Sequence, residues 1–568
     1  MQRVFMVGWD GATFDLIKPW MEVGKLPNIA RLMDSGVHGM LRSTLPPWTF
    51  PAWTSFMTGK NPGKHGIFDF FRSKPNSYDL EFVNGGHRRA ATFWQILSRA
   101  GRRVVSISLP CTFPPEPVNG IMISGFDFPG EGPGSHVDST GMHPPELFQE
   151  LERHVGRHPI DTPIARDINE GRPEAALQRV LGTIRQKAAT AKYLLNRPWD
   201  CFMILFGESD GCAHQFWKYC DPKSPLFDDR SPTMRDSLLR IYQELDTQLG
   251  ELVDGVAPDT VVMVMSDHGF GGSSNWVIHP NRWLEEQGFL QFRGSLSLRL
   301  SRWGERLKHW GSTNLPAALQ RFLFRCATPI LNRFESSVRH GMIDWERTEA
   351  YFEENPYFPF LRINLKGRQP HGTVAAGAHY EEVCNRLIQA LSQWRHPVTN
   401  QPIIEKVYRR DEVYSGPYTG EAPDLVAKWA LCQGYNYSFR LSSKTSKGKW
   451  LKQFDGRQGE FGKYFNNKSG SHRDDGIFLA AGPGLRSAVE IQGARIIDLA
   501  PTILHVLGVP VPGDMDGKVL TAIFDQAPVL APVAGTTVSD GPSEPNGAYS
   551  AADERMIGER LQSLGYVE

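Results

Sequence analysis

Residues 260–269 read Thr-Val-Val-Met-Val-Met-Ser-Asp-His-Gly, an apolar run that passes directly into an acid and an imidazole. The length of this run and its β-branched residues are typical of a buried strand. Further runs of the same kind occur at Arg3–Gly8, Arg103–Leu109, Cys201–Phe206 and Ile477–Ala481. Residues 173–196 and 237–253 carry apolar side chains at helical spacing, as the crossovers between parallel strands require. We therefore predict an α/β protein with a largely parallel sheet.

Acids and histidines stand at the ends of the predicted strands. Six such side chains follow a strand or, in one case, precede it: Asp10, Asp210, His214, Asp267, His268 and His472. Because ligand sites of open α/β sheets lie at the carboxyl ends of the strands, we expect these side chains to converge in one crevice. Asp and His together are ligands that zinc takes in proteins, and six of them suit two metal ions.

The candidates for a nucleophile lie in residues 45–59, Leu-Pro-Pro-Trp-Thr-Phe-Pro-Ala-Trp-Thr-Ser-Phe-Met-Thr-Gly. The hydroxyl groups there belong to Thr49, Thr54, Ser55 and Thr58, and most hydroxyls in such a segment are helix caps or packing groups. Thr49 stands two residues before Pro51, at the predicted start of a helix, where free N–H groups and the helix dipole favour an anion. A threonine hydroxyl is a poor nucleophile unless a metal activates it, so this arrangement favours phosphoryl chemistry.

The order of these motifs resembles the alkaline phosphatase superfamily. Asp10 is followed by Thr-Phe-Pro at 49–51, Thr-Gly-Lys-Asn-Pro-Gly-Lys-His-Gly-Ile at 58–67, Asp-x-x-x-His at 210–214, Asp-His-Gly at 267–269 and His472. Within the superfamily the chain is similar to the type I phosphodiesterase/nucleotide pyrophosphatase family, over residues 1–290 and 406–525. The resemblance implies a three-layer α/β/α core with a central, mostly parallel sheet and a helical insert that forms a cap.

The resemblance also implies a hydrolase of phosphodiester or pyrophosphate bonds that uses two zinc ions. Asp210, His214 and His472 would hold one ion, and Asp10, Asp267 and His268 would hold the other, with Thr49 bridging toward the metals. Thr49 would attack phosphorus in line and form a phospho-threonine, which water later hydrolyses. Mn²⁺ or Fe can also occupy sites built from Asp and His.

Two positions depart from the family pattern. Ala52 stands where an Asn usually follows Thr-Phe-Pro, and residues 68–72 read Phe-Asp-Phe-Phe-Arg where the family usually places an Asn that touches the phosphoryl group. We consider Lys60, Lys64 and Arg72 as alternative groups that bind the phosphate. A phosphomonoesterase or a phosphotransferase on the same site therefore stays an alternative, as does a non-catalytic binding module.

The middle and the end of the chain differ from the predicted core. We expect core segments at 1–290 and 406–525, a helical or mixed cap insert at 291–405, a flexible linker at 526–551 and a C-terminal helix at 552–568. Residues 293–339 carry nine basic and two acidic side chains together with Trp303 and Trp310. This segment either packs on the core as a cap or meets a membrane surface or a long anionic substrate.

Composition limits the function classes. The 568 residues include 62 basic and 62 acidic side chains, a balance that argues against a nucleic-acid coat. No apolar run is long enough to span a bilayer, the N-terminus does not read as a signal peptide, and the seven cysteines form no disulfide framework. We expect a cytoplasmic enzyme that acts on a small-molecule or lipid-linked phosphoester, and its oligomeric state is left open.

Overall fold

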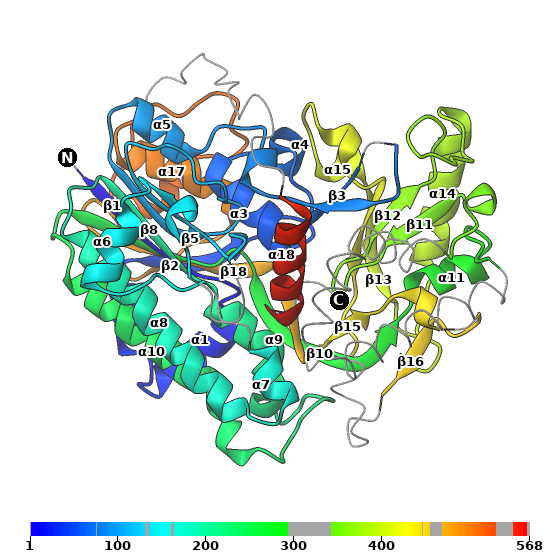
Figure 1. Ribbon diagram of the computed structural model, residues 1–568, viewed down its shortest axis with the longest axis horizontal. Coiled ribbons are helices and arrows are strands. Elements are labelled where there is room, and N and C mark those ends of the chain that lie inside the picture. The colour runs from blue at the N-terminus through cyan, green and yellow to red at the C-terminus, as the bar shows by residue number, and fades with distance from the viewer. Residues whose placement is uncertain are drawn as a thin grey trace.

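A computed structural model describes residues 2–74, 76–130, 136–160, 164–293, 342–445, 447–454, 468–529 and 549–564. Its main sheet has the strand order β19-β2-β18-β9-β1-β8-β5-β6-β7, and β20 pairs with β2 (Figure 1). Five neighbouring strands in the middle are parallel: β9 (Thr260–Met265), β1 (Arg3–Trp9), β8 (Cys201–Phe206), β5 (Val104–Leu109) and β6 (Gly120–Ser124). Among the remaining strands, β18 (Asp475–Ala481) runs antiparallel to β9 and β2 (Val37–Arg42), and β7 (Met142–His143) runs antiparallel to β6.

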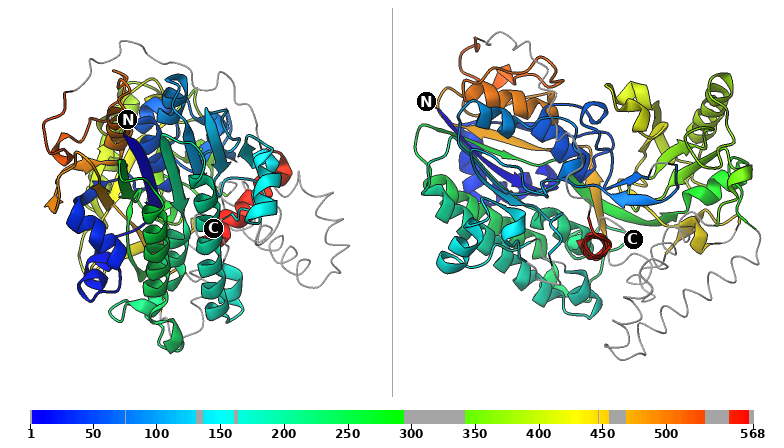
Figure 2. Two further views of the ribbon diagram at one scale, coloured as in Figure 1. Left: turned by 90° about the vertical axis from the view of Figure 1, so that its left-hand side faces the viewer. Right: turned by 45° about the horizontal axis from the view of Figure 1, so that its top comes forward.

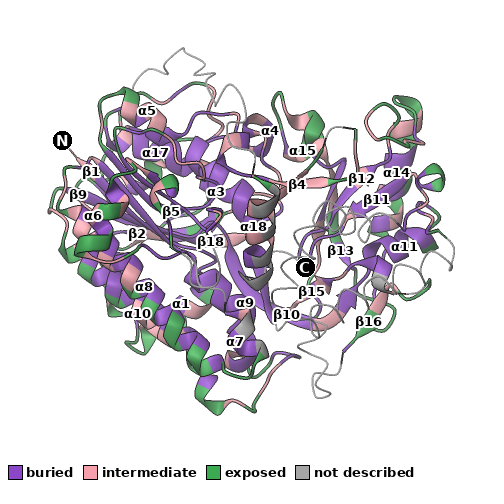
Figure 3. Ribbon diagram, viewed as in Figure 1, coloured by how far each residue is buried: buried purple, intermediate pink, exposed green. Residues whose placement is uncertain are grey.

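Helices cover both faces of this sheet. Side chains alternate along a strand, so Val4 and Met6 of β1 enter one apolar core while Phe5 and Val7 enter the other. One face is covered by α8 (Pro173–Leu195), α9 (Glu208–Cys220) and α10 (Ser237–Asp254), and the other by α3 (Thr49–Thr58), α5 (Phe93–Arg99) and α17 (Leu499–Val506). Figure 3 shows buried residues along the sheet and exposed residues on the outer sides of α8 and α10. These three layers confirm the predicted fold class.

A second sheet lies beside the main one and has an apolar core of its own (Figure 2). Its antiparallel strands are β11 (Ala350–Glu353), β12 (Phe360–Ile363), β14 (Leu425–Trp429) and β13 (Ile404–Arg409), and α14 (Ala378–Ser392) packs on β13. The predicted boundary between residues 405 and 406 falls inside β13 and would divide this sheet. The division of the chain into domains stays a prediction.

The strand β10 (Gly269–Ile278) links the two regions. It begins immediately after the candidate ligand His268 and pairs antiparallel with β17 (Gly470–Arg473), which carries the candidate ligand His472. Farther along, β10 pairs with β15 (Asn436–Phe439) and β16 (Leu451–Gln453), close to the second sheet.

The predicted helices at 173–196 and 237–253 are α8 and α10, and the C-terminal helix is α18 (Ala551–Leu564), which buries Ile557 and Leu561 in the main core. Except for its first residue, Arg293, the basic segment at 293–339 lies outside the described residues, and so does most of the predicted linker at 526–551. Within the described ranges, no helix combines the length and the apolar composition that a membrane crossing requires. The remaining named elements are α1 (Phe14–Glu22), α2 (Pro27–Ser35), α4 (Pro62–His65), β3 (Phe71–Ser73), β4 (Leu80–Phe82), α6 (Leu147–His154), α7 (Ala165–Asn169), α11 (Pro280–Glu286), α15 (Arg410–Val413), β19 (Val489–Glu490) and β20 (Ala494–Arg495).

Candidate active site

The six candidate ligands come together at the carboxyl edge of the main sheet. Because β9, β1 and β8 are parallel and in register, the residues that follow these strands emerge side by side. The helix α9 begins two residues after β8 and carries Asp210 and His214 one turn apart on the same face. All six side chains belong to residues that are at most 1% exposed: Asp10, Asp210, His214, Asp267, His268 and His472.

Backbone carbonyls fix the orientation of the three histidines. The Nδ1 atoms of His214, His268 and His472 each lie 2.9 Å from a carbonyl oxygen, of Gly470, Gly269 and Pro47 respectively. A carbonyl only accepts hydrogen bonds, so each Nδ1 carries the proton and donates it. In the neutral imidazole the lone pair then lies on Nε2, which is the form in which histidine binds a metal.

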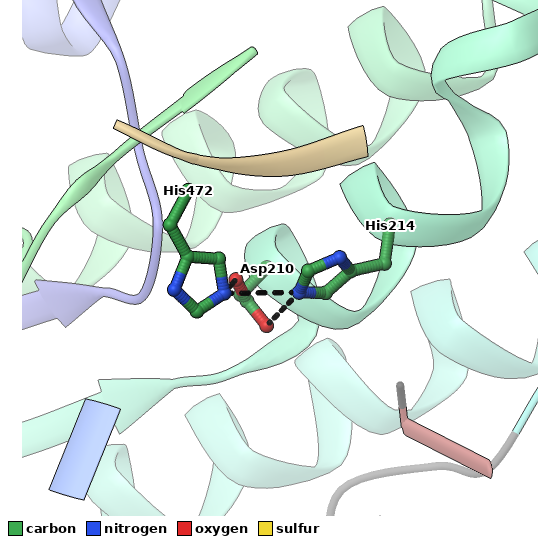
Figure 4. A group of neighbouring side chains, drawn as sticks. All are labelled: Asp210, His214 and His472. Atoms are coloured by element: carbon green, nitrogen blue, oxygen red, sulfur yellow. Dashed lines mark hydrogen bonds and ion pairs between the residues drawn. The ribbon is translucent and has the colours of Figure 1, made fainter. Parts of the chain in front are cut away.

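Asp210, His214 and His472 form the first group of possible ligands (Figure 4). The Nε2 atoms of the two histidines lie 3.0 Å apart. Asp210 places Oδ2 at 3.4 Å from Nε2 of His214 and Oδ1 at 3.4 Å from Nε2 of His472. This is the set predicted for one of the two ions.

The second group surrounds Nε2 of His268. Oδ1 of Asp10 lies 3.6 Å from this atom, Oδ2 of Asp267 lies 3.4 Å from it, and Oδ1 of Asp210 lies 3.9 Å from it. The three that bring their ligand atoms close enough together to share one ion are Asp10, Asp210 and His268. Asp210 therefore belongs to both groups. Asp267, a predicted ligand of the second ion, lies next to this group because its Oδ2 is close to Nε2 of His268.

Burial controls the titration of the cluster. It raises the pKa of Asp10 well above its ordinary value and that of Asp267 to about 7. The charge of Asp210 adds to both shifts, whereas a hydrogen bond with Asp10 lowers the pKa of Asp267. Burial lowers the pKa of His214 to about 3 and that of His268 well below its usual range. Burial also favours the neutral form of Asp210, but the surrounding histidines outweigh it and lower the pKa. His214 and His268 are therefore neutral at pH 7 and bring no positive charge to the buried aspartates.

The donor set fits a divalent metal ion. Oδ1 of Asp10 and Oδ2 of Asp267 are buried and have no hydrogen-bond partner among the described residues. Burying a carboxylate oxygen without a partner costs on the order of several kcal/mol. This cost is comparable to the net free energy of unfolding of a typical domain. Both oxygens face the free lone pair of His268, so an ion bound between them would satisfy all three atoms.

Thr49 is the candidate hydroxyl that reaches this cluster. It is the first residue of α3, is fully buried, and places Oγ1 at 3.5 Å from Nε2 of His268. Two of the other candidate hydroxyls have partners elsewhere: Oγ of Ser55 lies 3.0 Å from Nε2 of His65, and Oγ1 of Thr58 donates to the carbonyl of Thr54.

The structure does not bring Lys60, Lys64 and Arg72 to the candidate ligands. Their side-chain nitrogens pair at 2.5 Å with Asp514, Asp516 and Glu81 respectively. Lys60 follows the C-terminal end of α3, whose last residue lies roughly 14 Å along the helix axis from Thr49. The predicted contact of these cations with the phosphoryl group therefore has no support in the geometry.

Two aromatic residues that the sequence did not indicate touch the cluster. Nε1 of Trp53 donates to Oδ2 of Asp10 at 2.9 Å, and the hydroxyl of Tyr357 lies 3.0 Å from Nδ1 of His214. Trp53 follows Thr49 by one helical turn, a spacing that could have indicated it. Tyr357 comes from the segment between β11 and β12, which carries no recognisable motif.

Comparison with known proteins identifies relatives of the chain. A family model described as type I phosphodiesterase/nucleotide pyrophosphatase matches residues 4–456. No curated protein matches the chain. Solved structures with a similar fold include human and murine ectonucleotide pyrophosphatase/phosphodiesterase 5, each with a TM-score of 0.45 and 14% identity over 89% of this chain and 95% of the other. An inactive variant of the murine protein in complex with AMP has the same TM-score and identity over 90% and 96% of the two chains.

Proposed function

The chain belongs to the type I phosphodiesterase/nucleotide pyrophosphatase family, and from this we propose that it cleaves its phosphoester at a two-zinc centre through a phospho-threonine on Thr49. The class of hydrolase follows from the family, whereas the zinc ions, the nucleophile and the intermediate are our proposal. This proposal rests on one observation: the Nε2 atoms of three histidines, three buried carboxylates and one hydroxyl group lie close together in the structure.

Six side chains would hold the two ions. Asp210, His214 and His472 would bind one, and Asp10, Asp267 and His268 would bind the other, beside Thr49. When bound, the ions supply positive charge that lowers the pKa of the Thr49 hydroxyl and offsets the charge of the phosphoryl oxygens. Zinc is proposed from the mixture of carboxylate and imidazole donors, and Mn²⁺ or Fe would use the same ligands.

Thr49 performs the covalent step in this proposal. Its Oγ forms a bond to phosphorus while the bond from phosphorus to the leaving oxygen breaks, and the hydroxyl proton passes to water. A water molecule then displaces Thr49 from phosphorus. Its oxygen stays on the product, which is a phosphomonoester when the substrate is a diester, and one of its protons restores the hydroxyl. The leaving group departs as an alcohol from a diester or as a phosphate from a pyrophosphate.

The start of α3 supports the phosphoryl group during these steps. The residue before the helix, Trp48, makes no side-chain cap, so the N–H groups of Thr49 and Phe50 have no partner within the helix. These donors and the helix dipole favour negative charge at this position. Burial of the centre adds to the effect because electrostatic interactions are stronger away from bulk water.

Initial rates on bis-p-nitrophenyl phosphate and p-nitrophenyl phosphate test the proposal in the zinc-reconstituted, full-length chain. We expect the diester to be cleaved and Thr49→Ala to lower the rate by ~10³-fold or more. Rapid quenching with the diester followed by intact-protein mass spectrometry should detect one added p-nitrophenyl phosphoryl group in the wild type and none in Thr49→Ala.

Thr58→Ala is the matched control, because it removes a buried hydroxyl from the same helix at the end away from the ligands. We expect it to keep the wild-type rate. Full activity in Thr49→Ala would refute the nucleophile. Faster cleavage of the monoester would keep the site and change the enzyme to a phosphomonoesterase.

A further inference from the structure

The segment that joins β11 to β12 in the second sheet, residues 354–359 (Glu-Asn-Pro-Tyr-Phe-Pro), is a buried loop. All six residues are buried. Connecting segments normally run over the surface, because their backbone polar groups need partners. This one instead reaches the candidate ligands of the main sheet, where its Tyr357 contacts His214.

Hydrogen bonds fix the conformation of the loop. The side chain of Asn355 accepts from the N–H groups of Tyr357 at 3.1 Å and Phe358 at 2.6 Å, and it donates to the carbonyl of Phe358 at 2.8 Å. At the start of the loop, the carboxylate of Glu354 accepts from the N–H of Ser442 at 3.0 Å. The position of Tyr357 is therefore determined by the second sheet and by the loop itself.

Tyr357 lies against the histidines of the first ligand group. Its hydroxyl is 3.0 Å from Nδ1 of His214, and its ring is stacked on the ring of His472 with an interplanar angle of 16° and a centroid distance of 5.4 Å. The ring of Trp48, next to the nucleophile candidate, meets it at 61° and 5.5 Å. The ammonium group of Lys468 stands 5.3 Å from the centre of the tyrosine ring.

The contact with Nδ1 bears on metal binding. Because the carbonyl of Gly470 accepts from the same Nδ1 at 2.9 Å, this nitrogen carries the proton and the tyrosine oxygen shares it. Two partners on Nδ1 hold the plane of the imidazole and turn Nε2 toward Asp210 and His472. In known metal sites, loss of the group that holds the second nitrogen of a ligand histidine typically weakens metal binding by about 10- to 100-fold.

We propose that Tyr357 is a positioning residue of the metal centre, through which the second sheet holds His214 in its metal-binding orientation. The proposal rests on the two-zinc centre described above and extends it, because it makes the second sheet part of the site. Tyr357 acts through His214 and takes no part in the bond-making steps.

Zinc affinity of the full-length chain, measured by competition with a chromogenic chelator after metal removal, tests this role. Tyr357→Phe keeps the ring and removes the hydroxyl, and we expect it to weaken the binding of one of the two ions by ~10-fold. Tyr351→Phe is the matched control, since Tyr351 is a buried tyrosine of β11, six residues earlier. We expect the control to keep the wild-type affinity.

A second variant tests the same role in case Tyr357→Phe fails to fold. Asn355→Ala loosens the loop but keeps the hydroxyl, and we expect a smaller loss of zinc affinity in the same site. Wild-type zinc affinity in both Tyr357→Phe and Asn355→Ala would overturn the proposal. Asp210→Asn separates this failure from that of the centre: if it also binds both ions as the wild type does, the two-zinc centre itself is refuted.

Discussion

Buried aspartates occur in both sheets, and the two sheets compensate their charge in different ways. In the second sheet, Asp424 accepts from Arg368 at 2.5 Å and from Arg410 at 2.7 Å, and Ile363 donates its N–H to the same carboxylate at 2.8 Å. In the main sheet, Asp10 and Asp267 face a neutral histidine and each keeps one oxygen without a hydrogen-bond partner among the described residues.

The difference separates a structural ion pair from a ligand site. A buried carboxylate requires positive charge nearby, because its transfer from water is otherwise strongly unfavourable. At Asp424 the chain supplies this charge, and the two arginines lower the pKa of the carboxyl despite its burial. At Asp10 and Asp267 burial prevails and raises the pKa, so we infer that the charge comes from bound metal ions.

The largest effect is expected at Asp210, which stands in both ligand groups. Asp210→Asn removes a charged ligand from each group, so the diesterase rate should fall by ~10³-fold or more and zinc should be lost. Metal-free Asp267→Asn, by contrast, should be at least as stable near pH 7 as the metal-free wild type, because burial raises the pKa of Asp267 and the fold disfavours its charged form. Elemental analysis, initial rates and urea unfolding check these three points, and wild-type zinc content would contradict the comparison.

Asp424 should show the opposite pattern. Asp424→Asn leaves Arg368 and Arg410 without their buried partner, and loss of one side of such a pair lowers the free energy of unfolding by about 3–5 kcal/mol. Zinc content and the rate per folded molecule should not change. The exposed Asp259→Asn serves as a surface control with an expected effect within about 0.5 kcal/mol. A stability equal to that of the wild type would show that the two arginines do not need this carboxylate.

The smallest effect concerns the pH dependence of the stability of the metal-free protein. Asp267 and Asp424 are expected to change this stability in opposite directions as the pH rises. The pKa of Asp267 is raised in the folded state to about 7, so its contribution is present at low pH and is lost as the pH rises toward 7. The pKa of Asp424 is lowered, so its contribution is present above the unfolded value of about 4 and is lost as the pH falls through the folded value.

Urea unfolding of the chelator-treated protein between about pH 2.5 and pH 7.5 measures this dependence on both sides of the unfolded pKa of aspartate. Asp267→Asn should remove the loss of stability toward neutral pH, and Asp424→Asn should remove the loss toward acid pH. The same pH profile in Asp267→Asn and the wild type would mean that Asp267 ionises in the folded protein without a penalty.

The strands and the ligand group could be predicted from the sequence because their signals are local. A short apolar run that ends in Asp or Asp-His marks both a buried strand and its carboxyl end, and parallel strands bring such ends together. Thr49 could be found in the same way, because Pro51 indicates the start of a helix. In each case the sequence indicates the residue, and the fold then brings these residues close together at one edge of the sheet.

Contacts between distant segments could not be predicted. Lys60 and Lys64 look like phosphate ligands in their motif, but their partners Asp514 and Asp516 lie more than 450 positions away for each pair. Tyr357 reaches His214 only because a buried loop of the second sheet ends at the metal-ligand group. No local pattern distinguishes a tyrosine that supports a ligand from one that fills a core.

Zinc content and thermal unfolding of the full-length chain, measured together before and after treatment with a chelator, test whether the buried cluster is a two-zinc centre. We expect two zinc ions per chain, a lower melting temperature after their removal, and recovery when zinc is added back. Under the same conditions Asp210→Asn should show no zinc-dependent change. A wild-type chain that binds no zinc, Mn²⁺ or Fe and melts at one temperature with or without them would contradict the claim.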